Sequence, residues 1–267
     1  MKKIIGLGPP RSGTTWFFEN LKLHPEIAVP HGLKETHFWE KPNIDPNRFE
    51  KLFAIKDSSK FLLDISPRYI ANINFEKLQS EFSNDFFVLF LRDPFSRINS
   101  HIRFRNSQGH SFSLESFQKS YWNRYIFIAD YIKKLKEYTR PDQLFIVRYE
   151  SIAENPLSLL MQFSDFVGLS NYEFQERILK EKIHYSWTPR NQIINFLLPR
   201  LQIVLRKSVP TFADFLKHSK VIKTLISKKD VPPSYLDNAQ DSFLHELNED
   251  TYKIQELLKI DLSEWII

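Results

Sequence analysis

The sequence predicts an α/β fold: a single domain with a central parallel sheet flanked by helices and a helical C-terminal half. Three observations predict it. Short apolar runs alternate with helical patterns along the first part of the chain. One run, Phe86–Leu91, is nearly all apolar, as expected for a strand buried on both faces. A further apolar run ends in a glycine-containing turn that leads into a helical pattern. The expected parts are a core sheet in about 1–170, a helical region in about 171–230 and C-terminal helices in about 231–267.

The elements follow from local patterns. Short runs rich in β-branched or aromatic residues and bounded by turn residues predict strands at 3–8, 60–65, 86–91 and 144–147. Apolar residues at helical spacing predict helices at 13–23, 113–138, 156–167, 234–247 and 250–259. Asp93-Pro94 combines an N-cap with a proline at the first helical position, so another helix is expected there. The basic, apolar segment 196–229 is interpreted as a helical lid or as a surface for anionic lipid or an acidic acceptor.

Composition excludes several classes of protein. The chain has no cysteine, which excludes disulfides, thiolate catalysis and cysteine-ligated zinc. Its apolar runs are too short to span a bilayer, and Met1-Lys2-Lys3 leads directly into the first expected strand, so we expect a cytoplasmic protein. The net charge of +5 suits an anionic ligand, but also an ordinary basic protein. The basic residues show no recognition-helix or RNA-motif pattern, so no nucleic-acid partner is expected.

Residues 4 to 15, Ile-Ile-Gly-Leu-Gly-Pro-Pro-Arg-Ser-Gly-Thr-Thr, join the first expected strand to the first expected helix. Backbone N–H groups and the positive end of a helix dipole at such a turn attract an anion. Gly8 and Gly13 have the spacing of a Walker A loop, but Thr14 stands where that loop has lysine, and Arg11 carries the cation. We therefore expect a phosphate-binding loop. A P-loop kinase, which needs the missing lysine and a Mg²⁺-binding acid, is the alternative.

A second anion site is expected after the buried strand. Arg92 stands at its carboxyl end, where open α/β sheets bind ligands. Ser100 follows two turns into the next helix, with Arg97 one turn before it on the same face. A guanidinium and a hydroxyl together suit a phosphate. The alternative is a surface ion pair of Arg92 with Asp93 and an ordinary helical serine.

These two motifs resemble those of sulfotransferases that use 3′-phosphoadenosine 5′-phosphosulfate (PAPS). Pro10–Trp16 resembles their 5′-phosphosulfate loop, and Leu91–Ser100 resembles their 3′-phosphate motif. Further similar segments follow in the family's order: Lys34–Trp39, Ser66–Tyr69, Val147–Ile152 and Leu257–Trp265. The Glu-x-His-Phe pattern is similar to the carbohydrate (heparan-type) branch, and the lack of cysteine fits a bacterial-type member. The resemblance implies a P-loop-like sulfotransferase fold, PAPS as co-substrate, 3′-phosphoadenosine 5′-phosphate (PAP) as product, and no metal.

The resemblance also implies roles in donor binding. The 5′ end of PAPS would be held by Arg11, Ser12, Gly13, Thr14 and Thr15, and the 3′-phosphate by Arg92 and Ser100. Trp16 would pack near adenine, or else be a core aromatic. Lys228 or Lys229 would close over the nucleotide, or else form a solvated pair. Arg11 would stabilise charge on the leaving phosphate oxygen without donating its proton.

For the acceptor side, Glu35 matches the family's catalytic glutamate and would take the proton of the acceptor hydroxyl. His37 would lie on the same side of an extended segment, orienting the acceptor or sharing the proton transfer. The alternatives are an ion pair for Glu35 and a structural role for His37. Ile65 stands where carbohydrate sulfotransferases usually have a lysine. The expected activity is sulfuryl transfer to a hydroxyl, of a glycan by resemblance; a non-catalytic protein that binds PAP or another anion is a further alternative.

Overall fold

The computed structural model describes residues 1–41, 43–108, 110–175, 179, 234–237 and 239–267. By internal contacts the chain divides into two compact units, considered separately below. The first comprises Met1–Arg97, Arg124–Ile183 and Leu244–Ile267, and the second comprises Ile98–Asn123 and His184–Phe243. Lys228, Lys229, the basic segment 196–229 and most of the helical region expected in 171–230 lie outside the described residues.

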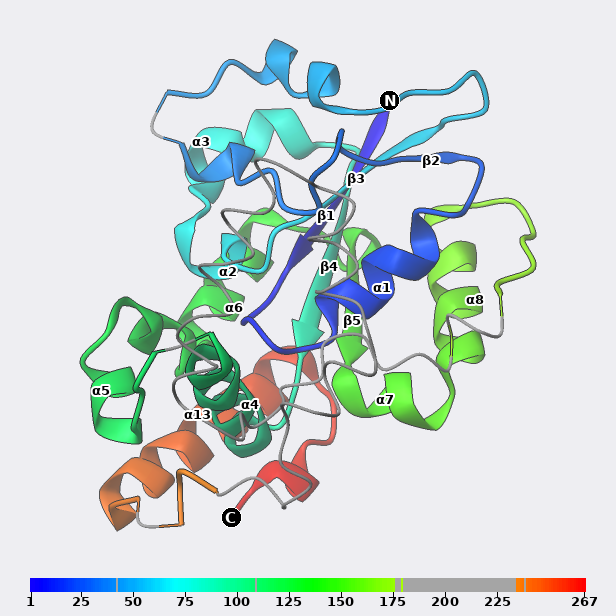
Figure 1. The fold of residues 1–267 in the computed structure, drawn as a ribbon. Coiled ribbons are helices and arrows are strands. Elements are labelled where there is room, and N and C mark those ends of the chain that lie inside the picture. The colour runs from blue at the N-terminus through cyan, green and yellow to red at the C-terminus, as the bar shows by residue number, and fades with distance from the viewer. Residues whose placement is uncertain (42, 109, 176–178, 180–233, 238) are drawn as a thin grey trace, which may run out of the picture. The chain divides into compact units, whose positions relative to one another are not determined.

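The first unit contains a five-stranded sheet in the order β2-β3-β1-β4-β5 in which all pairings are parallel (Figure 1). Its strands are β1 Lys2–Leu7, β2 Ile27–Ala28, β3 Phe61–Ile65, β4 Phe86–Leu91 and β5 Leu144–Arg148. The expected α/β class and parallel sheet are confirmed. The two-residue β2 was not predicted, because so short a strand carries no alternation. After β1 the chain adds β2 and β3 on one side of β1, and then β4 and β5 on its other side. The strand order therefore reverses between β1 and β4, and such sheets bind ligands at the carboxyl ends of the two strands at this point.

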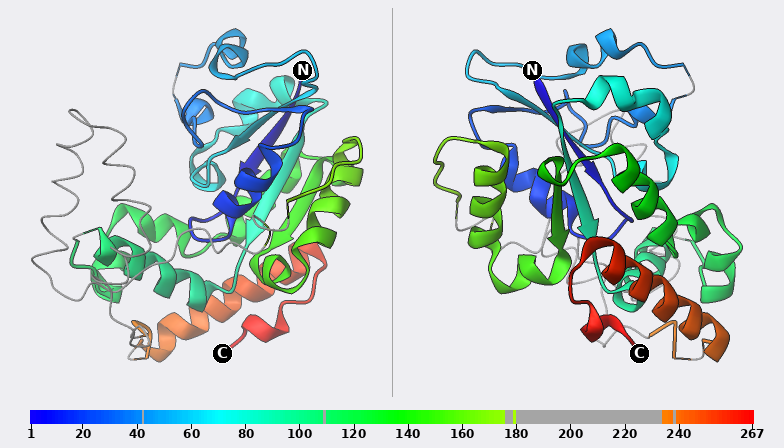
Figure 2. Two further views of the ribbon diagram at one scale, coloured as in Figure 1. Left: turned by 45° about the vertical axis from the view of Figure 1, so that its right-hand side comes forward. Right: turned by 180° about the vertical axis from the view of Figure 1, so that it is seen from behind.

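Helices cover both faces of this sheet. On one face lie α1 Thr14–Leu21 and α8 Pro156–Val167, where Phe17 packs edge-on against Phe90 and Phe163. On the other lie α2 Tyr69–Asn72, α3 Phe75–Leu78 and α6 Ala129–Tyr138, where Phe75 contacts Phe87 and Tyr138. Figures 1 and 2 show α1 and α8 together on one side of the sheet and α3 and α6 on the other. The sheet thus lies between two helical layers.

The expected single helix over 113–138 is wrong. The chain forms α5 Leu114–Gln118, a 3₁₀ turn over Tyr121–Tyr125, and then α6. A buried side chain, Arg97, and a partly buried one, Asp250, take up the backbone groups that a continuous helix would use. The Arg97 guanidinium donates to the carbonyls of Tyr125–Ile126, and the Asp250 carboxylate accepts from the amides of Ile128–Ala129 at 2.9 and 3.0 Å. The interruption therefore depends on residues distant in sequence.

The expected pair of helices over 234–247 and 250–259 is also wrong, because one helix, α13, runs over Asp241–Leu258. Polar side chains in its middle bond away from the backbone that they would otherwise disrupt. Asn248 pairs with both backbone groups of Ile267, and Asp250 caps α6.

By contrast, the predicted helix start after β4 is confirmed: α4 covers Pro94–Ser107, and the Asp93 carboxylate accepts from two amides of its first turn. Within the described parts of the chain, no helix has both the length and the apolar character to cross a bilayer.

Candidate active site

The loop between β1 and α1 is a tight turn that needs glycine at both ends. Gly8 has φ 154°, and a Cβ there would lie 2.6 Å from the carbonyl oxygen of Phe90 on β4. Gly13 has φ 89°, and a Cβ there would lie 2.4 Å from Cδ1 of Ile152. Arg11 between them also has a left-handed φ of 77°. The loop therefore packs directly against the end of β4 and against α7, Tyr149–Glu154, a helix that was not predicted.

The start of α1 suits an anion. This fully described helix has neither an acidic residue in its first turn nor a side-chain N-cap, so its positive end is not neutralised from within. Thr14, its first residue, is only 5% exposed, and Thr15 beside it is partly exposed. The Ser12 hydroxyl is fully buried and has no hydrogen-bond partner among the described residues. This donor set fits a phosphate or sulfate group.

Arg92 supports this loop from the end of β4. Its Nη1 donates to the Arg11 carbonyl at 2.9 Å, and its guanidinium lies 3.9 Å from the ring centroid of Tyr149. Burial lowers the pKa of Arg92, but an arginine remains protonated at physiological pH. The structure thus places Arg11 and Arg92 next to each other at the carboxyl edge of the sheet, and their separate roles at the 5′ and 3′ ends of the donor stay predictions. Tyr149 was missed in this position, since its packing depends on α7.

Three further residues that the sequence analysis placed near the donor, Ser100, Arg97 and Trp16, are buried. Ser100 is buried in the part of α4 that belongs to the second unit, so its role at the 3′-phosphate stays a prediction. Arg97 is also buried, and its guanidinium is committed to the carbonyls of Tyr125–Ile126. Trp16 is 6% exposed within the core, and its indole N–H donates to the Leu179 carbonyl at 3.2 Å. These contacts support the core interpretation of Trp16.

A single lysine, Lys34, links Glu35 to the start of α1. Lys34 Nζ is 3.0 Å from Glu35 Oε1 and 3.2 Å from Thr14 Oγ1. On its other side, Glu35 Oε2 is 3.4 Å from His37 Nε2, and His37 Nδ1 is 2.8 Å from Glu40 Oε1. The structure therefore joins the two predicted acceptor-side residues to the phosphate loop. Lys34 was missed, although its place immediately before the predicted base was a signal.

The charges of Lys34, Glu35 and His37 depend on one another. Burial alone would raise the pKa of Glu35, but hydrogen bonds from His37 and Lys34 outweigh it and lower the pKa to about 2. The bonds to Glu35 and Glu40 raise the pKa of His37 to about 9. Burial lowers the pKa of Lys34 despite the attraction of Glu35. Near neutral pH Glu35 is ionised and His37 is protonated, so Glu35 is the one of the two that can accept a proton.

The expected extended segment is a turn instead. His37 has φ 49° and precedes a 3₁₀ turn over Phe38–Glu40, because Arg68 and His37 both bond Glu40 and draw the chain back. The imidazole nevertheless lies on the side of Glu35, as expected.

A buried carboxylate in β3 anchors the segment that carries Glu35 and His37. Asp64 accepts hydrogen bonds from Thr36 Oγ1 at 2.6 Å, from Tyr69 Oη at 2.6 Å and from Ser66 Oγ at 3.0 Å. Burial raises the pKa of Asp64 against these bonds. Asp64 was not singled out from the sequence, although a carboxylate inside the apolar run Phe61–Ile65 was a usable signal.

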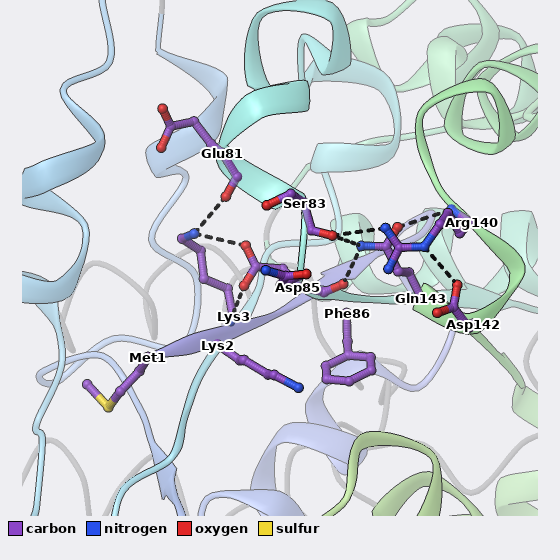
Figure 3. Close-up of a pocket in the computed structure, with 11 residues that line it drawn as sticks. Met1, Lys2, Lys3, Glu81, Ser83, Asp85, Phe86, Arg140, Asp142 and Gln143 are labelled. Atoms are coloured by element: carbon purple, nitrogen blue, oxygen red, sulfur yellow. Dashed lines mark hydrogen bonds and ion pairs between the residues drawn. The ribbon is translucent and has the colours of Figure 1, made fainter.

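A surface pocket of about 470 Å³ lies at the opposite, amino-terminal edge of the sheet (Figure 3). Several of its polar groups are paired with one another or with backbone carbonyls. Lys3 binds Asp85 at 2.9 Å, Arg140 binds Asp142 at 3.1 Å, and the Gln143 amide donates to three backbone carbonyls. These contacts stabilise the loops before β4 and β5, and the candidate site remains at the carboxyl edge.

The fold is that of an α/β protein with a parallel sheet, and its candidate site places the Glu35 carboxylate near a helix start that suits an anion. The sequence model of the sulfotransferase domain matches residues 1–193, so the chain belongs to the sulfotransferase domain family. The expectation of a sulfotransferase enzyme is confirmed at this level. The comparison with curated protein sequences found no match.

Three solved sulfotransferase structures are similar to this chain. The sulfotransferase of Alicyclobacillus acidocaldarius has a TM-score of 0.67 and 14% identity, over 99% of this chain and 98% of that one. The sulfotransferase domain of the Synechococcus PCC 7002 olefin synthase has a TM-score of 0.51 and 16% identity, over 98% and 96%. Mouse SULT7A1, solved in complex with PAP, has a TM-score of 0.50 and 13% identity, over 95% and 84%. These similarities confirm the fold.

Proposed function

We propose that the protein transfers a sulfuryl group from PAPS to an acceptor hydroxyl, giving a sulfate ester and PAP. One observation carries the proposal: the Lys34 ammonium bonds both Thr14, the first residue of α1, and the Glu35 carboxylate. These two bonds support an anion site and a base side by side at the edge of the sheet where ligands bind. Membership of the sulfotransferase family supports the reaction type.

The residues of the loop fit the donor. The tight turn, the positive end of α1 and the buried Ser12 hydroxyl suit the 5′-phosphosulfate, with Arg11 on the leaving-group side. Arg92 and Ser100 are assigned to the 3′-phosphate, as the family motif suggests. Support for this nucleotide also comes from mouse SULT7A1, which was solved with PAP.

The residues around Glu35 fit the chemistry. The acceptor oxygen attacks sulfur as the bond from sulfur to the 5′-phosphate oxygen breaks, and that electron pair stays on PAP. Glu35 accepts the proton of the hydroxyl. Arg11 stabilises the charge that grows on the phosphate oxygen. His37, protonated near neutral pH, holds Glu35 in place through Nε2 while its Nδ1 pairs with Glu40, so it orients the acceptor through Glu35.

Calorimetry tests the nucleotide assignment. We expect the wild-type protein to bind PAP at least about tenfold more tightly than ATP with Mg²⁺, a difference of about 1.4 kcal/mol. The opposite preference would contradict the proposal and favour a P-loop kinase. Labelled PAPS incubated with a lysate of the source organism then separates an enzyme, which labels an acceptor, from a protein that only binds PAP.

For the acceptor we propose a carbohydrate hydroxyl, because Glu35, His37 and Phe38 follow the pattern of the carbohydrate branch. Digesting the labelled product with glycosidases tests this: release of the label on small sugar fragments supports it, and label on lipid contradicts it. A cytoplasmic, bacterial-type enzyme is part of the same proposal, since a chain without cysteine needs no oxidising compartment.

A further inference from the structure

We propose that Lys34 contacts the 5′-phosphosulfate of the donor and is a catalytic residue, the second cation of the reaction beside Arg11. This inference rests on the proposed function. It assigns a role to a side chain outside the donor-binding motif, at a site where the expected second cation is replaced by Ile65.

The position of the ammonium supports this role. Lys34 Nζ is 3.2 Å from Thr14 Oγ1, at the first turn of α1, so it lies where a group bound to the end of that helix would be. Its side chain is only 17% exposed, and its second bond, at 3.0 Å, is to Glu35. An ammonium has three donors, and these two contacts leave one to point at a ligand.

The electrostatics of the position point to an anion. A cation at the positive end of a helix is unfavourable, and burial adds to the cost. Glu35 offsets this charge, but Glu35 is shared with His37, which is protonated near neutral pH. A phosphosulfate at the start of α1 would satisfy both the helix end and the ammonium.

Contact between Lys34 and the donor would also make Glu35 more basic. While Lys34 binds Glu35, the pKa of Glu35 is about 2, which makes that carboxylate a weak proton acceptor. When Lys34 turns toward the negative charge on the donor, Glu35 loses part of this stabilisation and becomes more basic. The electron pair of the broken sulfur–oxygen bond then stays on a phosphate oxygen next to Lys34, while the acceptor proton goes to Glu35.

Equilibrium binding tests the inference without knowledge of the acceptor. The affinities for PAPS and for adenosine 3′-monophosphate, which lacks the 5′ group, are measured in the wild type and in Lys34→Met. We expect Lys34→Met to weaken PAPS binding by about tenfold to a hundredfold, the effect of one charge-assisted hydrogen bond, and to leave adenosine 3′-monophosphate unchanged. Lys34→Gln, which also removes the charge, should behave in the same way and guards against a misfolded variant. Lys22→Met, at the opposite end of α1 where Lys22 pairs with Glu19, is the matched control and should change neither affinity.

The possible results distinguish a failure of the proposed function from a failure of the inference about Lys34. A wild-type protein that binds PAPS no better than adenosine 3′-monophosphate overturns the proposed function and this inference with it. A Lys34→Met or Lys34→Gln variant that keeps the wild-type preference for PAPS overturns the inference alone. Equal weakening of both ligands, with normal folding, also overturns it, because Lys34 would then only support the loop.

Discussion

Thr36 donates its hydroxyl to the Asp64 carboxylate at 2.6 Å, across 28 residues of sequence. Thr36 stands between Glu35 and His37, so this bond fixes the acceptor-side residues to the rigid sheet. Asp64 also accepts from Ser66 and Tyr69, and a fully buried carboxylate needs such donors to stay in place.

We expect Asp64→Asn to lower the free energy of unfolding by about 1–3 kcal/mol, because an amide leaves buried hydroxyls without an acceptor. Urea denaturation measures the change. Asp57→Asn, at an exposed position of the loop before β3, is the control and should shift stability by less than about 0.5 kcal/mol. Equal stability of the two variants would show that the Asp64 network does not hold this segment.

Gly13→Ala should abolish most PAP binding. The added Cβ would lie 2.4 Å from Ile152 at φ 89°, so the loop must move away from α7. Gly168→Ala is a matched control: its φ is 79°, but no described heavy atom lies within 4 Å of the added Cβ. We expect Gly168→Ala to cost about 1 kcal/mol of stability and to leave PAP affinity intact. Calorimetry distinguishes them, and unchanged PAP affinity in Gly13→Ala would argue against this loop as the phosphate site.

The stability of the protein should fall as pH rises from 6.5 to about 9, the interval between the ordinary and the folded pKa of His37. A raised pKa means that the folded state binds more protons in this interval, so the stabilisation is complete below pH 6.5 and is lost through pH 9. His37→Gln should flatten this part of the profile of unfolding free energy. An unchanged slope would contradict the ion pairs of His37 with Glu35 and Glu40.

Glu35→Gln should reduce sulfuryl transfer by about 10²–10⁴-fold, the usual contribution of a general base. PAP affinity should not fall below the wild-type value, because the amide keeps the shape of the side chain and no longer competes as an anion for Lys34. Transfer from labelled PAPS to the lysate acceptor gives the rate. A near-normal rate would remove Glu35 as the base.

The sheet could be predicted because buried parallel strands need contiguous apolar residues, as in Phe86–Leu91. The tight turn between β1 and α1 could be predicted for a similar reason, since its glycines and Arg11 are close together in sequence. The break within 113–138 could not, because it depends on Arg97 and Asp250, which reach it from other helices.

The surroundings of Glu35 were predicted only in part. His37 is close in sequence, and its approach to Glu35 was expected. The contact of Lys34 with Thr14 depends on how the loop after β2 returns to the start of α1, which no local pattern encodes. Asp64 is likewise brought to Thr36 by the sheet.

A crystal structure with PAP bound tests the central claim most directly. The account predicts the 5′-phosphate at the start of α1, contacting the Gly8–Gly13 turn and Arg11, with the 3′-phosphate at Arg92. Phosphates found away from both Arg11 and Arg92 would contradict it.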